Sequence, residues 1–118
     1  MSEKIFINAR IIDPSQKIDE IGSLILDKKG KVKAIGKNVK ESEAEASAEI
    51  FDIKGNVLIP GIVDMKAFVG EPGFEYKENF RTLSKAALAG GVTSIVTMPN
   101  TKPVIDNVSM VDFIIRRG

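Results

Sequence analysis

Two residues near the end of an apolar stretch of this chain could take part in chemistry. The stretch NVLIPGIVDMKAFVGEPG, residues 56–73, has the pattern of a buried strand that runs into a loop, with Lys66 and Phe68 two positions apart. Side chains at i and i+2 of a strand share a face, and α/β active sites collect at the carboxyl ends of strands. Lys66 could therefore be a catalytic or Schiff-base lysine, but we favour one that pairs with a carboxylate or reaches solvent. We interpret Phe68 as a core or interface residue rather than a ligand platform.

Two other polar residues follow strand-like segments. Glu71 lies in a loop bounded by Gly and Pro, where it could act as a general base, but the sequence offers it no partner. Asn100 follows Pro99 at the end of the segment VTSIVTMP. Its side chain could bind a ligand or stabilise the turn, and both interpretations stay open. We assign no catalytic residue and no metal ligand.

Composition excludes several kinds of site. The 118 residues include no Cys and no His. Disulfides and thiolate sites are therefore excluded, and the commonest general base and the commonest zinc ligand are missing. The absence of Cys suits a cytoplasmic protein, which is the location we expect.

Charge and hydropathy argue against two classes of partner. Seventeen basic and 16 acidic residues give a net charge of +1, and the basic residues are dispersed, so we expect no binding to nucleic acid. The N-terminal segment alternates apolar and polar residues, unlike a signal peptide, and no apolar run approaches the length of a membrane span. We therefore expect no association with a membrane.

The pattern of apolar residues predicts a β-rich first half and an alternating second half. The first half is predicted to contain strands at residues 5–12, 23–27, 32–36 and 49–53, turns at 13–16 and 28–31, and a polar loop or short helical turn at 37–49. The second half is predicted to contain buried strands at 57–68 and 92–99 and helices at 76–89 and 108–117. Phe80, Leu83, Ala87 and Leu88 are expected on one face of the first helix. Gly90 and Gly91 indicate a helix end rather than a phosphate loop.

Strand, helix, strand, helix is the pattern of two β/α units of a parallel sheet. A (β/α)8 barrel needs eight units and about 250 residues, so this chain cannot close one. The two units either form a small α/β layer alone or begin something larger, and the β-rich first half favours the second alternative. We predict an α/β chain with an N-terminal β-sandwich portion, residues 1–56, followed by the first two β/α units of an incomplete TIM-type barrel, residues 57–118.

Several motifs of the chain resemble one family. LIPGIVDM, EPGFEYKE and SKAALAGGVTSIVTMPNTKPVID are similar to the dihydroorotase branch of the amidohydrolase superfamily, and the resemblance runs from Ile5 to Asp106. PGIVD occurs across amidohydrolases, whereas EPGFE together with MPNTKPVID is far more specific. The resemblance implies a small β-sandwich domain, a metal-bearing barrel, and a zinc-dependent hydrolase that opens or closes a dihydropyrimidine ring.

The same resemblance implies a His-x-His metal pair and then an Arg at the end of the first barrel strand. Here those positions are Lys66, Phe68 and Gly70, so we regard them as degenerate metal and substrate positions. An ammonium cannot ligate a metal without losing its proton, and a phenyl ring has no lone pair. Asn100 is implied to hold the substrate carboxylate together with the missing Arg, so half of that clamp remains. The other ligands of the family come from later barrel strands.

The leading hypothesis is a non-catalytic dihydroorotase-like protein, a pseudoenzyme of pyrimidine biosynthesis. No cofactor is expected for this chain, although the family uses zinc. Some relatives that lack their ligands are non-catalytic partners of aspartate carbamoyltransferase, so we expect such a partner and a homo- or hetero-oligomer. Two alternatives stay open. One is an active metal-dependent cyclic amidohydrolase with ligands from outside this segment, and the other is a small α/β binding module.

Overall fold

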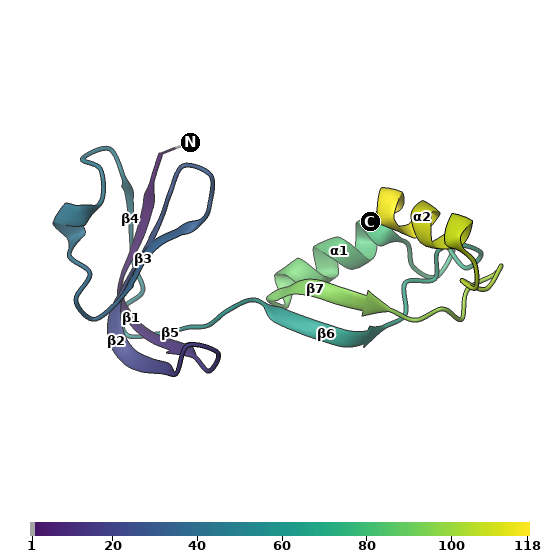
Figure 1. Cartoon of the computed structure of the whole chain (residues 1–118), viewed down its shortest axis with the longest axis horizontal. Coiled ribbons are helices and arrows are strands. Elements are labelled where there is room, and N and C mark those ends of the chain that lie inside the picture. The colour runs from purple at the N-terminus through teal and green to yellow at the C-terminus, as the bar shows by residue number, and fades with distance from the viewer. Residues whose placement is uncertain (1) are drawn as a thin grey trace. The chain divides into compact units, whose positions relative to one another are not determined.

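The computed structural model describes residues 2–118 and divides the chain into two compact units (Figure 1). The first unit ends at Pro60 and the second begins at Gly61. The first contains strands and the second alternates strands and helices, so the protein is a mixed α/β chain. The division falls later than residue 56, where sequence patterns suggest a boundary, because the short strand β5 pairs with the first strand of the chain.

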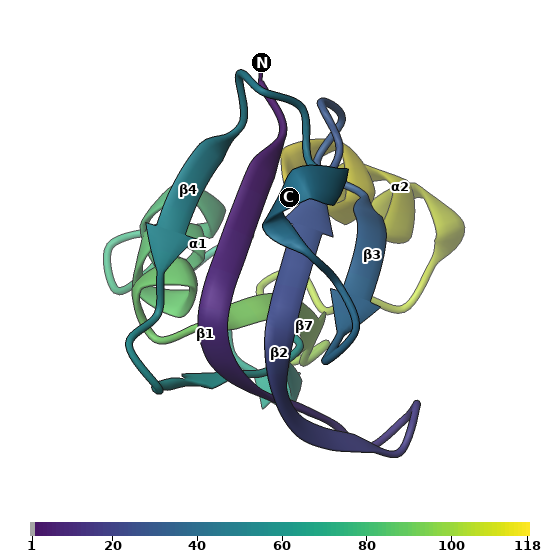
Figure 2. The same cartoon turned by 90° about the vertical axis from the view of Figure 1, so that its left-hand side faces the viewer.

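The first unit is one five-stranded sheet (Figure 2). Its elements are β1 (Lys4–Asp13), β2 (Ile18–Leu26), β3 (Val32–Gly36), the 3-10 helix η1 (Glu41–Glu43), β4 (Glu49–Asp52) and β5 (Val57–Leu58). The strand order is β3-β2-β1-β4, and β5 also pairs with β1. β1, β2 and β3 are antiparallel to their neighbours, whereas β4 and β5 run parallel to β1. Each predicted strand of this half is found, although β2 begins at Ile18 rather than at residue 23, and the short helical turn lies in the predicted polar segment.

A bulge lets β1 pair with two strands in turn. The register between β1 and β2 shifts between Phe6 and Ala9, and Asn8 has a left-handed φ of 56°. Asn tolerates this conformation better than most residues. Its side-chain amide donates to Asp52 Oδ1 at 3.0 Å. β1 therefore pairs with β4 before the bulge and with β5 after it.

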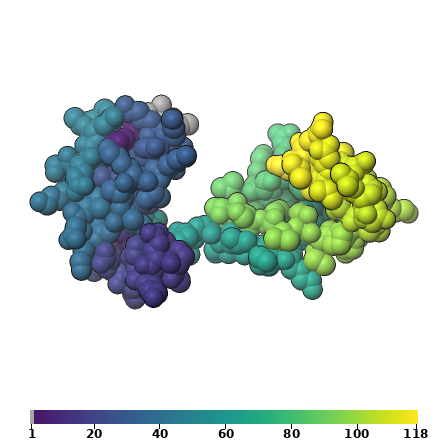
Figure 3. Space-filling view, viewed as in Figure 1, coloured from purple at the N-terminus to yellow at the C-terminus, as the bar shows by residue number. Residues whose placement is uncertain are grey.

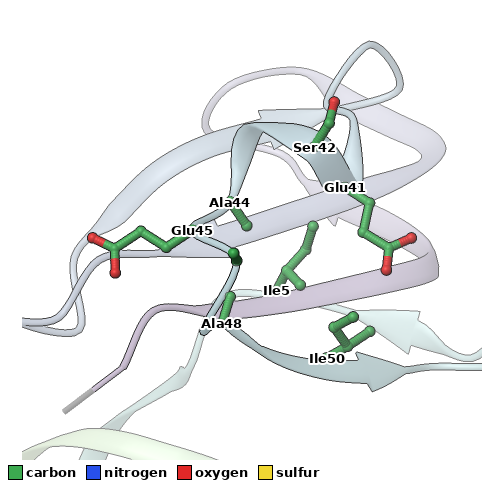
Figure 4. A pocket seen from close by; sticks show the side chains of 8 residues that line it. Ile5, Glu41, Ser42, Ala44, Glu45, Ala48 and Ile50 are labelled. Carbon is green, nitrogen blue, oxygen red and sulfur yellow. The ribbon is translucent and has the colours of Figure 1, made fainter.

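The core of the first unit is apolar and centres on β1 and β2. Ile5, Ile11 and Ile25 are almost completely buried. A cavity of about 560 Å³ lies between the sheet and the segment that carries η1 (Figure 4), lined by Ile5, Glu41, Ser42, Ala44, Glu45, Ala46, Ala48 and Ile50. The carboxylates of Glu41 and Glu45 point in opposite directions in this view, so no polar groups converge on the cavity. We interpret it as a packing gap under a segment of small side chains.

Glu3 fastens the η1 segment to the sheet. Its side chain is buried, and its carboxylate accepts hydrogen bonds from Lys33 Nζ at 2.7 Å and from the Glu45 N–H at 2.9 Å. The hydrogen bond from Lys33, followed by that from the Glu45 backbone, holds the pKa of Glu3 below its ordinary value. The buried charge is therefore compensated from two elements.

The second unit is a two-stranded parallel sheet with two helices. Its elements are β6 (Ile62–Ala67), α1 (Phe80–Ala89), β7 (Val92–Thr97) and α2 (Val108–Arg117). The predicted order of strand, helix, strand and helix is confirmed, but the single strand predicted at 57–68 is divided into β5, which pairs with β1, and β6, which pairs with β7. α1 begins at Phe80 rather than at residue 76, because Asn79 caps it by accepting a hydrogen bond from the Thr82 N–H. Asn107 caps α2 in the same way, through the Met110 N–H.

Predictions of burial in the second unit were wrong. Both strands were expected to be buried, yet most of their residues are exposed, including Met65 at 71% and Val96 at 48%. Leu88, expected on the apolar face of α1, is 68% exposed. The physical reason is that apolar strands of a parallel sheet need cover on both faces, which two strands and two helices do not supply.

Both helices of the second unit are ten residues long. Among residues 2–118, no helix combines the length and apolar character needed to cross a membrane.

Candidate functional site

The candidate site lies at the carboxyl ends of β6 and β7. Ala67 pairs with Thr97, and the Met98 N–H donates to the Ala67 carbonyl at 2.9 Å. Because the strands are parallel, the loops that follow them start side by side (Figure 1). The structure thereby brings together the two segments that carry the positions singled out in the sequence: Lys66, Phe68, Gly70 and Asn100.

Lys66 is exposed, and it forms no ion pair within residues 2–118. The sequence suggested a lysine that either pairs with a carboxylate or reaches solvent, and the structure favours exposure to solvent. Its backbone N–H donates to Asp64 Oδ1 at 2.9 Å. Asp64 therefore stabilises the local backbone of the strand, and the Lys66 ammonium stands at this edge of the sheet without an ion pair in the described residues.

Phe68 joins a small aromatic cluster on the loop after β6. Its ring is 39% exposed and lies 6.0 Å from the ring of Phe74, measured between centroids. The Phe74 ring lies 6.4 Å from Tyr76, and Lys77 Nζ lies 5.6 Å from each of these two rings. Position 68 therefore contributes apolar surface to the site and half-buried packing to the loop.

Gly70 makes the tightest turn of this loop. It is buried and has a left-handed φ of 82°. Its carbonyl accepts a hydrogen bond from the Phe74 N–H at 2.6 Å. A Cβ atom at this position would lie 2.7 Å from the Glu78 carbonyl oxygen and 3.1 Å from that of Phe74. The loop thus has a conformation and a packing that favour glycine at position 70 over any larger residue.

Asn100 is exposed, and its side chain makes no hydrogen bond within the described part of the chain. The turn is held instead by its buried neighbour Thr101, whose N–H donates to the Pro99 carbonyl and whose Oγ1 donates to the Pro103 carbonyl at 2.8 Å. Stabilisation of the turn by Asn100 itself therefore has no hydrogen bond to support it. The amide of Asn100 is available to a ligand. Sequence reasoning missed Thr101, whose role depends on the shape of the loop.

Glu71 differs most from its prediction. We expected an exposed acid without a partner, but its side chain is 3% exposed. Its Oε1 accepts a hydrogen bond from Arg117 Nε at 2.7 Å, and its Oε2 accepts one from the Phe80 N–H at 3.1 Å. Both partners are distant in sequence, so no local pattern indicates them. With both oxygens engaged, Glu71 is a poor candidate for a general base.

A second acidic residue of the same loop, Glu75, accepts a hydrogen bond from the backbone. The Gly73 N–H donates to Glu75 Oε1 at 2.9 Å, and this hydrogen bond is the main cause that holds the pKa of Glu75 below its ordinary value. Nearby, the Lys102 N–H donates to the Pro72 carbonyl at 2.9 Å. The loops after β6 and β7 are therefore joined to each other by backbone hydrogen bonding.

The residues present do not fit the zinc centre that the sequence resemblance implies. Zinc takes nitrogen, sulfur or oxygen ligands, and a protonated lysine and a phenyl ring provide none. Within residues 2–118, no group of three or more His, Cys, Asp or Glu side chains is arranged to hold a metal ion. What the site does present is a free ammonium, an aromatic surface and a free amide.

Comparison with known families and proteins gives a consistent result. Residues 55–117 match the dihydro-orotase-like family, which is more than half of the chain. A dihydroorotase of Pelobacter propionicus is 48% identical over 111 residues, covering 94% of this chain and 25% of the relative. A dihydroorotase of Geotalea daltonii is 46% identical, covering 97% and 26%, and one of Aquifex aeolicus is 40% identical, covering 100% and 27%. The chain spans about a quarter of the length of these curated relatives.

Among solved structures, the chain is similar to the β-aspartyl dipeptidase of Fervidobacterium islandicum AW-1 in complex with a β-Asp-Leu dipeptide. The identity is 20% and the TM-score is 0.46, over 92% of this chain and 36% of the dipeptidase.

The packing around Gly70 generates a test. Gly70→Ala should lower the free energy of unfolding by about 2–4 kcal/mol. A residue other than glycine is unfavourable in the left-handed conformation, and its Cβ would also lie too close to the Glu78 carbonyl oxygen. Gly91→Ala is the matched control, since Gly91 has a φ of 80° but no atom within 4 Å of a built Cβ. It should cost only about 1–2 kcal/mol. Denaturant unfolding followed by circular dichroism measures both, and equal costs would contradict the close contact.

Proposed function

The chain belongs to the dihydro-orotase-like family, and from that premise we propose that the residues of this chain do not catalyse the opening or closing of a dihydropyrimidine ring. Its role in pyrimidine biosynthesis is instead to bind a ligand or a partner. We assign this role to the cytoplasm, in keeping with a chain that contains no Cys.

One observation carries the proposal: Lys66 is the second-last residue of β6, and Phe68 is the first residue after that strand. The family resemblance implies two imidazoles there, and these would grip one metal from the same face of the strand. An ammonium repels a cation instead. Two like unit charges 4 Å apart repel by about 4 kcal/mol at an effective dielectric constant of 20, and a divalent ion doubles the effect. Phe68 fills the second ligand position with apolar surface.

The loss extends to the substrate clamp. At position 70 the resemblance implies an Arg, whose two parallel hydrogen bonds suit a carboxylate. Gly70 provides no side chain, and a Cβ there would lie 2.7 Å from the Glu78 carbonyl oxygen. A reverting substitution would thus require the loop to move. Asn100, with a free amide, is the residue that we propose retains contact with a ligand carboxylate.

For the fold, we propose that the first unit is part of the small β-sandwich domain of this family and that the second unit is the first two β/α units of its barrel. The support is the parallel pairing of β6 and β7 and the exposure of their apolar residues. Such strands require cover on both faces. The chain is therefore expected to form part of a larger assembly.

We propose aspartate carbamoyltransferase as the partner in a hetero-oligomer. The supporting feature is the apolar surface of the second unit, which includes Ile62, Val63, Met65, Leu88, Val111 and Ile115. Apolar side chains exposed in such numbers are typical of surfaces that another chain covers. Sedimentation velocity of the chain mixed with the transferase should give a faster boundary than either component alone, and two unchanged boundaries would contradict the partnership.

Metal content and turnover test the central proposal. Plasma mass spectrometry of the purified chain should find no stoichiometric zinc, and a dihydroorotase assay with added zinc should find no turnover, because positions 66 and 68 offer no ligand. The variant Lys66→His/Phe68→His is the matched comparison and should retain more zinc, since it restores imidazoles at i and i+2. Stoichiometric zinc together with turnover in the unaltered chain would favour the active hydrolase instead.

A titration tests the proposed role of Asn100. Dihydroorotate should bind the chain weakly, and Asn100→Ala should weaken it about tenfold or more, because a hydrogen bond to a charged group contributes about 1.5–3 kcal/mol. Asn38→Ala, which removes an exposed amide in the first unit, should leave the affinity unchanged. Isothermal calorimetry measures all three proteins. Equal affinities for the wild type and Asn100→Ala would refute a binding role for this amide.

A further inference from the structure

Glu71 is a buried acid that the proposed ligand site does not use directly. Its side chain is 3% exposed, and its two carboxylate oxygens have different partners: the Arg117 guanidinium and the Phe80 N–H. Burial of a carboxylate costs free energy unless hydrogen bonds and an opposite charge compensate for the lost hydration. Both forms of compensation are present here. Glu71 thus joins three segments, namely the loop after β6, the start of α1 and the end of α2.

The contact with Phe80 brings a second carboxylate to the start of α1, where Glu78 already accepts a hydrogen bond from the Asn79 N–H. The first turn of α1 contains no acidic residue. The N-terminal end of a helix carries unpaired amides and a partial positive charge, both of which a carboxylate stabilises. Asn79 satisfies the Thr82 N–H, and Glu71 satisfies the Phe80 N–H from the preceding loop. The loop is therefore fastened to the helix that follows it.

The contact with Arg117 fastens the end of α2 to the same point. The other side-chain hydrogen bonds and ion pairs of α2, within residues 2–118, stay inside the helix or its cap, such as the ion pair of Arg116 with Asp112 at 2.9 Å. At Gly118, a built Cβ would lie 3.4 Å from the Phe80 ring, so the end of α2 lies beside the start of α1. The Glu71–Arg117 pair thus fixes the C-terminal end of α2 against the first β/α unit.

We propose that Glu71 is a positioning residue for the candidate site, an inference that rests on the ligand-binding role proposed for that site. Glu71 directly follows Gly70 in the loop that begins at Phe68. The next residue, Pro72, accepts a hydrogen bond from the Lys102 N–H in the loop of Asn100. Through its two helix contacts, Glu71 holds both loops in the arrangement that presents Asn100 to a ligand.

Arg117→Gln provides the test, because it removes the ion pair but leaves Glu71 free to accept from the Phe80 N–H. Arg116→Gln is the matched control, since Arg116 lies in the same helical turn and pairs only with Asp112 in the described residues. Two properties of the full chain are measured: the amide resonances of Gly70 and Thr101 in ¹H–¹⁵N spectra, and the dissociation constant for dihydroorotate. Arg117→Gln should shift these resonances and weaken binding about threefold to tenfold, whereas Arg116→Gln should change neither.

Conservative replacement separates positioning from general stability. Arg117→Lys keeps the positive charge and should recover part of the affinity, and Glu71→Gln combined with Arg117→Gln should lose little more than Arg117→Gln alone. The proposal is overturned if the amide resonances of Gly70 and Thr101 have the same positions in Arg117→Gln as in Arg116→Gln. A wild-type chain that binds no dihydroorotate would refute the ligand-binding role, while the resonances would still decide the role of Glu71.

Discussion

The candidate site depends on the parallel pairing of β6 and β7. This pairing, extended by the hydrogen bond from the Met98 N–H to the Ala67 carbonyl, starts two loops at the same edge of the sheet. The backbone connection between Lys102 and Pro72 then joins the loops beyond the strands. Residues more than thirty positions apart in sequence become neighbours in one loop cluster for this reason. Without the pairing, neither the exposed Lys66 nor the free amide of Asn100 would have a defined environment.

The edge of the sheet combines a well-supported backbone with side chains that do not suit a metal ion. The local supports are intact: Asp64 accepts the Lys66 N–H, Thr101 holds the second loop, and Glu71 anchors the first. The exposed side chains there are an ammonium and an aromatic ring, and neither offers a lone pair to coordinate a metal ion. On the function proposed above, this scaffold would keep its shape and its contacts without performing metal chemistry at this edge.

The exposed apolar strands show how strongly the second unit depends on further contacts. Met65 at 71% exposure lies on a strand whose composition suits burial on both faces. The first unit is better closed, since Ile5 and Ile25 are fully buried and Glu3 fastens the η1 segment over the sheet. The two halves of the chain thus differ in how much of their own core they contain.

The sequence by itself determined the local structure of this protein. Apolar periodicity predicted most of the strands and helices, and the glycines after α1 were recognisable as a helix end because a cap acts within a few residues. Motifs such as EPGFE were enough to indicate the family. Only the tertiary structure decided the burial of Glu71, its pairing with Arg117, and the exposure of Met65. These depend on which distant segments meet, and a pairing across 46 positions leaves no periodic signal in the sequence.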